Sequence, residues 1–388
     1  MPCPIAGTIW LRALENWNSR ASANPNLYQG TAMKRVRLGV VGCGAVAQVQ
    51  HLPNLALLRD EFSVDIVCDL SPSLAANVAA EFHIPRHTNN LEELLSSDVD
   101  AVLLCHTDPK TEAAIAAFNA GKHVLIEKPV CFSLSEIEQM TAAQQRAGTV
   151  GMAAYMKVYD PAFEQALDLT QRMQHIRYAQ INHLHTDNAH HLSHFRLHRA
   201  TDLPPNSLKT AQESRNRSAR KAIGDVSDSV RGAFFKLAGS MIHDLYGART
   251  VLGIPERVLS TELWNDGWGI HTVLAYSSGA RCAATWVELP AVREFKETLE
   301  VSSDDSRLLL SYPTGFARGI LSTLEVQHLD EAGDPVCSRP SIAWESPFVR
   351  ELKHFHACIV DGATPRTPLA EARHDIALII DIIGAYKG

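Results

Sequence analysis

Residues 39–47 read GVVGCGAVA and directly follow an apolar run that begins at Val36. The pattern predicts a buried strand that turns into a helix, with the GxGxxA spacing of a dinucleotide-binding fingerprint. Gly42 permits the tight turn, Gly44 lets the backbone approach a pyrophosphate, and Ala47 lets the helix lie close to the strand. The unpaired N–H groups of the helix would then face the phosphates. A glycine-rich turn that binds no ligand has the same pattern, so the residues that follow decide between the two.

An acidic residue ends the next apolar strand, 64–68. Asp69 stands at about the distance expected of the carboxylate that accepts hydrogen bonds from the adenosine ribose, roughly 20 residues past the glycines. A carboxylate at this point repels a 2′-phosphate, and no arginine follows in the sequence CDLSPS, so NAD is favoured over NADP. The alternative interpretation is that Asp69 caps the helix that starts near Ser71.

The composition favours a globular enzyme and excludes several classes of protein. The chain has 388 residues, of which 46% are hydrophobic and 20% charged, and a formal net charge of −7. This leaves a core large enough for two domains and gives no sign of a nucleic-acid partner. No apolar run reaches the roughly 18 residues of a membrane helix, so no membrane association is expected.

The eight cysteines have no CxxC spacing, and several fall inside apolar strands. This pattern predicts reduced, buried thiols in a cytoplasmic protein. Residues 1–32 lack the order of basic end, apolar middle and small-residue cleavage site that a signal peptide has. We interpret them as a disordered N-terminal extension.

Strands and helices alternate from residue 36 to about residue 155. This alternation predicts an α/β domain over residues 33–155, a Rossmann doubly wound parallel sheet with ligands at the carboxyl ends of its strands. The predicted strands are 36–41, 64–68, 99–105 and 123–126, and the predicted helices lie near 45–58, 72–82 and 111–120.

Longer runs with a period of two follow residue 175. They predict that residues 156–388 form an α+β domain for substrate binding and oligomerisation, with a mostly antiparallel open sheet. Helices would cover one face of this sheet, and the other would pair subunits into a homodimer or homotetramer. A polar stretch at 199–232 is long for a loop and is interpreted as a lid or an insertion. The predicted strands are 176–185, 258–264, 270–276, 281–289, 298–301 and 308–310.

Five segments resemble the Gfo/Idh/MocA oxidoreductase family, which includes inositol dehydrogenases and glucose-fructose oxidoreductases. The resemblance extends from about residue 36 to the C-terminus. It implies an NAD(P)-dependent enzyme that transfers a hydride between nicotinamide and a hydroxyl-bearing carbon of a sugar, cyclitol or related polyol. The segments are GVVGCGAVA at 39–47, AGKHVLIEKPV at 120–130, AYMKVYDPAF at 154–163, SMIHDLYGARTVLG at 240–253 and FVRELKHFHACIVDGATPRTP at 348–368.

Lys128 of the EKP motif is the first catalytic candidate that the resemblance implies. Its ammonium would face the nicotinamide, bind cofactor ribose and substrate hydroxyl, and stabilise alkoxide-like charge during hydride transfer. Glu127 would contact the cofactor ribose or orient Lys128. In similar proteins the peptide before Pro129 is often cis. The alternative is a lysine that extends to solvent from a strand end.

His243 is the second catalytic candidate, because a neutral imidazole can take the hydroxyl proton as the hydride leaves. In the family a helix carries an Asp four residues before this His, but here Gly239 occupies that position. Asp244 would point about 100° away around a regular helix, so Tyr246 or Ser240 is expected to supply the missing polar contact. A His that merely packs in the helix is the alternative.

Two further residues, Tyr155 and Lys157, are expected to line the substrate pocket, although a packed Tyr and a surface Lys fit the sequence nearly as well. The residues predicted to bind the cofactor are Gly42, Gly44, Ala45, Val46, Asp69, Thr107, Glu127 and Lys128. Those predicted to bind substrate are Tyr155, Lys157, Ser240 and Tyr246.

Histidines are dense between residues 183 and 198. If this segment were helical, His190, His194 and His198 would share one face, a spacing that can bind zinc. Hydride transfer in similar enzymes needs no metal, so no metal is predicted. A pocket or lid role for one or two of these histidines, and plain packed or solvated histidines, stay open.

Two other functions are compatible with the sequence. A redox-neutral sugar-modifying enzyme would use bound NAD transiently, oxidising and re-reducing one carbon. A non-catalytic regulator would bind the dinucleotide and a partner protein without turnover, and would be expected to lack the EKP lysine that is present here as Lys128.

Overall fold

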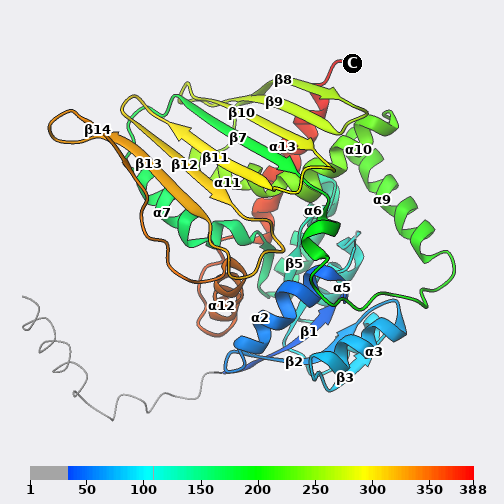
Figure 1. Cartoon of the computed structure of the whole chain (residues 1–388). Helices are drawn as coiled ribbons and strands as arrows, with labels where there is room; N and C mark the ends of the chain where they lie inside the picture. Colours follow the sequence, from blue (N-terminus) through cyan, green and yellow to red (C-terminus); the bar gives the residue numbers. More distant parts are fainter. Residues whose placement is uncertain (1–33, 108) are drawn as a thin grey trace, which may run out of the picture. The chain divides into compact units, whose positions relative to one another are not determined.

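The computed structural model describes residues 34–107 and 109–388, and residues 36–388 form one compact unit. The predicted extension at 1–32 lies outside the described residues. Two sheets organise the compact unit (Figure 1). One buried hydrophobic cluster includes Val102 of the first sheet and Trp286 of the second, so the two sheets share part of one core.

The first sheet has six parallel strands in the order β3-β2-β1-β4-β5-β6. This confirms the predicted doubly wound Rossmann sheet. Two of its strands, β3 and β6, were not predicted. The strands are β1 (Val36–Val41), β2 (Phe62–Cys68), β3 (Arg86–Thr88), β4 (Ala101–Leu104), β5 (His123–Glu127) and β6 (Gly151–Ala154).

The helices of this half begin where the sequence supplies a cap. Ser71 accepts a hydrogen bond from the N–H of Leu74 at the start of α3, and Ser133 and Glu136 form a capping box at the start of α6. The helix after the glycine turn contains a π-helical turn, η2, where a regular helix was predicted. The elements are η2 (Ala47–His51), α2 (Leu52–Leu57), α3 (Pro72–Glu81), α4 (Leu91–Leu95), α5 (Thr111–Asn119) and α6 (Leu134–Ala147).

The second sheet has eight strands in the order β14-β13-β12-β11-β7-β10-β9-β8. It is antiparallel except for the pairing of β7 with β10. The mostly antiparallel sheet is therefore confirmed. The strands are β7 (Tyr178–His185), β8 (Arg257–Trp264), β9 (Gly269–Ala275), β10 (Arg281–Glu288), β11 (Lys296–Ser302), β12 (Ser306–Tyr312), β13 (Thr323–Leu329) and β14 (Pro335–Ser338).

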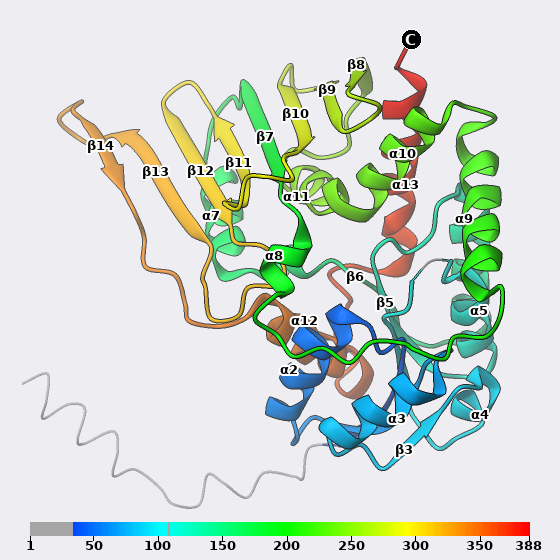
Figure 2. The same ribbon diagram turned by 45° about the vertical axis from the view of Figure 1, so that its right-hand side comes forward.

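Helices cover one face of this sheet, as Figures 1 and 2 show for α7 (Pro161–Thr170), α11 (Ile242–Leu252) and α13 (Ala372–Gly384). Within the described ranges no helix lies on the opposite face. The polar stretch at 199–232 contains most of α9 (Ser207–Ile223) and the start of α10 (Asp228–Lys236). None of the helices in the described part of the chain is both long and apolar enough to cross a membrane.

Candidate active site

A cavity lies where the carboxyl end of β5 meets the helical segment 237–252, below the ends of β7 and β11. Both catalytic candidates, Lys128 and His243, line it, although 115 positions separate them in the numbering. The glycine-loop helix reaches the same cavity through Val46. Other lining residues are Glu127, Met156, Lys157, His183, His185, Asn188, Gly239, Ser240, Phe295, Glu297, Thr314, Gly315, Phe316 and Phe348.

Lys128 is positioned by the strand end and by a backbone carbonyl. The Lys128–Pro129 peptide is cis, and Lys128 Nζ donates a hydrogen bond of 2.7 Å to the carbonyl oxygen of Gly239. This contact joins the end of the first sheet to the helix that carries His243. The ammonium therefore stands at the boundary between the predicted cofactor half and the predicted substrate half.

Glu127 lies beneath Lys128 and is held on two sides. Its Oε1 lies 2.7 Å from His51 Nε2, and its Oε2 accepts a hydrogen bond of 3.0 Å from the N–H of Lys128. Burial alone raises the pKa of Glu127, but the hydrogen bond and charge of His51, with Lys128, outweigh burial and lower it. Glu127 is thus a carboxylate that orients the backbone of Lys128.

The helix around Gly239 is not a regular α-helix. Residues Leu237–Met241 form a π-helical turn, η4, which continues into α11 at Ile242. Within this turn, Gly239 and Ser240 still line the same cavity as His243. A Cβ at Gly239 would meet no atom within 4 Å, so this position leaves room in the cavity where the family has a carboxylate.

His243 is oriented by Tyr246, one turn further along the helix. Its Nδ1 lies 2.8 Å from the Tyr246 hydroxyl oxygen, which also accepts a hydrogen bond of 3.1 Å from the N–H of Lys157. With Nδ1 engaged, Nε2 is the nitrogen left for a ligand. Burial, followed by the positive charges of Lys128 and Lys157, lowers the pKa of His243 well below its usual value. The imidazole is therefore neutral at pH 7.

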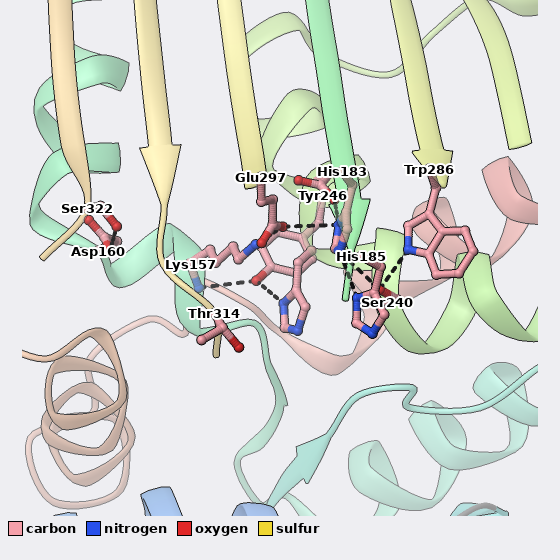
Figure 3. Close-up of polar contacts among 12 residues, drawn as sticks. Lys157, Asp160, His183, His185, Ser240, Tyr246, Trp286, Glu297, Thr314 and Ser322 are labelled. Atoms are coloured by element: carbon pink, nitrogen blue, oxygen red, sulfur yellow. Dashed lines mark hydrogen bonds and ion pairs between the residues drawn. The ribbon is translucent and has the colours of Figure 1, made fainter. Parts of the chain in front are cut away.

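A buried polar network lies beside these residues at the ends of the second sheet's strands (Figure 3). His183 Nδ1 lies 2.7 Å from Asp244 Oδ2, and Lys157 Nζ pairs with Glu297 Oε1. Burial lowers the pKa of Lys157 to about 8, against the attraction of Asp244. The side chain of Asp244 therefore contacts His183 on the second sheet and does not line the cavity beside Gly239.

Ser240 connects this network to the cavity. Its Oγ accepts a hydrogen bond of 2.9 Å from Trp286 Nε1 and lies 3.3 Å from His183 Nε2. His183 also lies 3.3 Å from His185, which lines the same cavity. Ser240 and His243 line the same cavity, and the role of Ser240 toward a substrate stays a prediction.

Three members of the network, His183, Asp244 and Glu297, are buried and could each offer one ligand atom within 4.8 Å of the others. However, Lys157 already pairs with Glu297, and His183 with Asp244. One oxygen of each carboxylate is therefore already engaged by a side chain of the network, Glu297 Oε1 by Lys157 and Asp244 Oδ2 by His183.

The proposed helical face of His190, His194 and His198 does not form, because α8 ends at Leu192 (Asn188–Leu192). The condition for a shared face, a helix over the whole segment, is therefore not met. Only His183 and His185 of the histidine-rich segment line the cavity, and both lie on β7.

Two of the four predicted substrate residues do not line this cavity. Tyr155 is buried and stacks on Tyr246, with ring centroids 4.1 Å apart. Tyr246 contacts His243 directly, and Tyr155 packs on the ring of Tyr246. Lys157 and Ser240 do line the cavity.

The predicted cofactor residues gather at the carboxyl edge of the first sheet. Gly42 has φ +92, and a Cβ there would lie 2.3 Å from the backbone nitrogen of His106, so only glycine fits. Asp69 accepts hydrogen bonds of 2.9 Å from the N–H groups of Cys43 and Ser71. Each carboxylate oxygen keeps lone pairs for ribose hydroxyls. Ser71, not Asp69, supplies the side-chain cap of α3, so the alternative interpretation of Asp69 as the cap is not supported.

The remaining predicted cofactor residues lie along this edge. Gly44 is exposed, and Ala45 and Val46 follow it in the first helical turn. Thr107 is exposed just past the end of β4. Their contacts with a dinucleotide stay predictions.

Gly44→Ala is expected to weaken NAD binding about tenfold, or about 1.4 kcal/mol, without changing the melting temperature. A Cβ at Gly44 meets no protein atom within 4 Å, so any loss would come from the ligand side. Titration calorimetry with NAD measures the effect. Gly384→Ala, also without neighbours within 4 Å, is the matched control. An unchanged affinity would contradict the placement of the pyrophosphate.

Sequence reasoning missed His51, Trp286 and Glu297 around this site, whereas His183 belongs to the histidine-rich segment for which a pocket role was left open. Each contacts a predicted residue across a large sequence separation, and none belongs to a local motif. A His or Glu within an apolar strand is a sequence signal that such a residue needs a polar partner in the core. The sequence does not show which residue that partner is.

Comparison with known proteins places this site in context. Residues 36–155 match the model of an oxidoreductase family with an NAD-binding Rossmann fold. The chain is 35% identical over 133 residues to a 4-carboxy-2-hydroxymuconate-6-semialdehyde dehydrogenase of Sphingobium sp., covering 33% of this chain and 41% of that protein. It is 31% identical over 134 residues to an inositol 2-dehydrogenase/D-chiro-inositol 3-dehydrogenase of Shouchella clausii, covering 34% and 38%. The chain thus spans about two fifths of these relatives.

Solved structures share the fold over most of the chain. A levoglucosan dehydrogenase in complex with NADH and levoglucosan has a TM-score of 0.71 at 18% identity, over 90% of this chain and 96% of that one. A 3-ketoreductase from Actinomadura kijaniata in complex with NADP has a TM-score of 0.68 at 18% identity, over 91% and 98%.

Proposed function

We propose that the chain is an NAD-dependent dehydrogenase of the Gfo/Idh/MocA type, on the premise that residues 36–155 match an oxidoreductase family with an NAD-binding Rossmann fold. Its substrate is a sugar, cyclitol or related polyol, oxidised reversibly at one hydroxyl-bearing carbon. The observation that carries the proposal is the meeting of Lys128 and His243 in one cavity, beside Val46 of the glycine-loop helix.

The geometry supports different roles for Lys128 and His243. Bound NAD would supply the hydride acceptor. His243 Nε2 takes the proton of the substrate hydroxyl, because the lowered pKa keeps the ring neutral and, in this role, Nδ1 carries the one ring proton and donates it to the Tyr246 hydroxyl oxygen. Lys128 Nζ donates a hydrogen bond of 2.7 Å to the Gly239 carbonyl oxygen. Its positive charge stabilises the negative charge that develops on the substrate hydroxyl oxygen as its proton leaves.

NAD is the preferred cofactor in this proposal because Asp69 stands where a 2′-phosphate would be repelled. The helix-free face of the second sheet supports a homodimer or homotetramer. We also propose a domain boundary at 155/156, between β6 and β7, and a cytoplasmic location. The latter is supported by the seven cysteines in the described residues, which are free and, except for Cys337, buried.

Turnover of the purified protein with NAD and a panel of sugars, cyclitols and sugar derivatives tests the function. We expect net NADH formation, followed by absorbance, together with a ketone or aldehyde product found by mass spectrometry. Product formation without net NADH would instead identify the redox-neutral enzyme. NAD binding with no turnover across the panel would favour the regulator.

A further inference from the structure

Residues 193–206, here termed the crossing segment, connect α8 to α9 and run past α2 and α3 (Figure 2). At one point the segment binds the glycine-loop helix: the N–H of His198 donates to Gln48 Oε1 at 2.9 Å, and Gln48 Nε2 donates to the His198 carbonyl at 3.0 Å. Gln48 Nε2 also donates to the carbonyl of Cys43 at 2.7 Å. The segment is therefore tied to the turn that would hold the pyrophosphate.

A second attachment lies four residues further along, at the N-terminus of α3. Asp202 Oδ2 accepts a hydrogen bond of 3.0 Å from the N–H of Ser73, and Oδ1 accepts one of 2.7 Å from Ser73 Oγ. Oδ1 also accepts a hydrogen bond from Ser71 Oγ. Donors from a helix N-terminus and two hydroxyls form a site for an anion, and the chain fills it with its own carboxylate.

This anion site adjoins Asp69, the residue proposed to bind the adenosine ribose. Asp69 Oδ1 accepts a hydrogen bond of 2.9 Å from the N–H of Ser71, while the hydroxyl of the same Ser71 binds Asp202. The hydrogen bonds from Ser71 and Ser73 lower the pKa of Asp202, so the group is ionised at neutral pH. A phosphate on the ribose 2′-oxygen would compete for these donors and would meet a second carboxylate beside Asp69.

We infer that Asp202 is a specificity-determining residue that excludes NADP by occupying the anion site at the N-terminus of α3. The inference rests on the proposed function, since it assumes that the chain binds a dinucleotide. It differs from the strand-end carboxylate of Asp69, because Asp202 comes from the other half of the chain and is brought there by the crossing segment.

The test measures dissociation constants for NAD and NADP by titration calorimetry on the full chain. In Asp202→Asn we expect the ratio of the NADP constant to the NAD constant to fall about tenfold, because one carboxylate next to a phosphate of about −1.5 to −2 charge is removed. Asp202→Glu keeps the charge and should keep most of the discrimination. We compare the ratio because detachment of the crossing segment alone would change the affinities for NAD and NADP by similar factors and would leave their ratio unchanged.

Asp305→Asn is the matched control. Asp305 also accepts hydrogen bonds from two serine hydroxyls, of Ser303 and Ser306, at 2.8 and 3.0 Å, but it lies in the turn between β11 and β12. In Asp305→Asn the ratio of the NADP to the NAD dissociation constant should equal that of the wild type. A wild type without preference for NAD, or an unchanged ratio in Asp202→Asn, would overturn the inference alone. A wild type that binds neither dinucleotide would overturn the proposed function itself.

Discussion

Lys128→Met is expected to lower kcat about 10²- to 10³-fold, the usual loss when one donor to developing negative charge is removed. The substitution keeps the length and apolar stem of the side chain and removes only the charge and its hydrogen bond to Gly239. Steady-state NADH formation with the substrate found in the panel measures kcat. Thermal unfolding checks that the fold is retained.

Lys122→Met is the matched control for this substitution. Lys122 lies just before the same strand, β5, is also half-buried, and also donates to backbone carbonyls, those of Ser97 and Val99 at 2.9 Å each. It is at the opposite end of the strand from the cavity, so kcat should stay within about twofold of the wild type. Equal losses in both variants would mean that a general effect of removing a lysine explains the result. An unchanged kcat in Lys128→Met would remove Lys128 from the mechanism.

The first sheet could be predicted because its signals are local. The turn at Gly42 and the acidic strand end at Asp69 each depend on neighbouring residues, and parallel strands bring their carboxyl ends to one edge. For the same reason the sequence could predict that Lys128 follows β5 at this edge, where it lines the cavity. The short strands β3 and β6 were missed because three or four residues carry too little periodicity.

The polar network behind the cavity could not be predicted, because its contacts join residues far apart in the sequence. The pair of His183 with Asp244 and the pair of Lys157 with Glu297 each connect different elements. The π-helical turn η4 directly precedes α11, and Gly239 and Ser240 line the cavity with His243. Sequence spacing could not show that Ser240 Oγ is engaged by Trp286 and lies near His183, because both residues come from distant strands.

The same spacing argument failed for the histidine-rich segment. Alternate positions on β7 direct His183 and His185 toward the cavity, whereas the later histidines belong to the short helix α8 and the crossing segment. A periodicity of two, visible in Tyr178–His185, predicted the strand. This periodicity could not show which end of the strand would lie near Lys128.

His243→Asn is expected to lower kcat/KM about 10²- to 10⁴-fold, the range for removal of a positioned general base. Asn fills similar space but cannot take a proton. His271→Asn is the matched control, because His271 is half-buried and its Nδ1 also has a hydroxyl partner, Thr285 at 2.9 Å, but it lies on β9 and does not line the cavity. Its kcat/KM should remain near that of the wild type.

The pH profile separates proton transfer from a packing role of His243. Substrate oxidation requires the neutral imidazole, so the rate falls as the pH drops through the pKa of His243. Burial and the charges of Lys128 and Lys157 lower that pKa, which places the acid limb of kcat/KM for the wild type below pH about 6.5. The limb should vanish in His243→Asn. In Tyr246→Phe, which removes the hydroxyl that contacts His243 Nδ1 and the N–H of Lys157, the acid limb should persist with a reduced rate. An acid limb that survives in His243→Asn would assign the general base to another group, and the half-buried ring of His243 would then be a packing residue beside Tyr246.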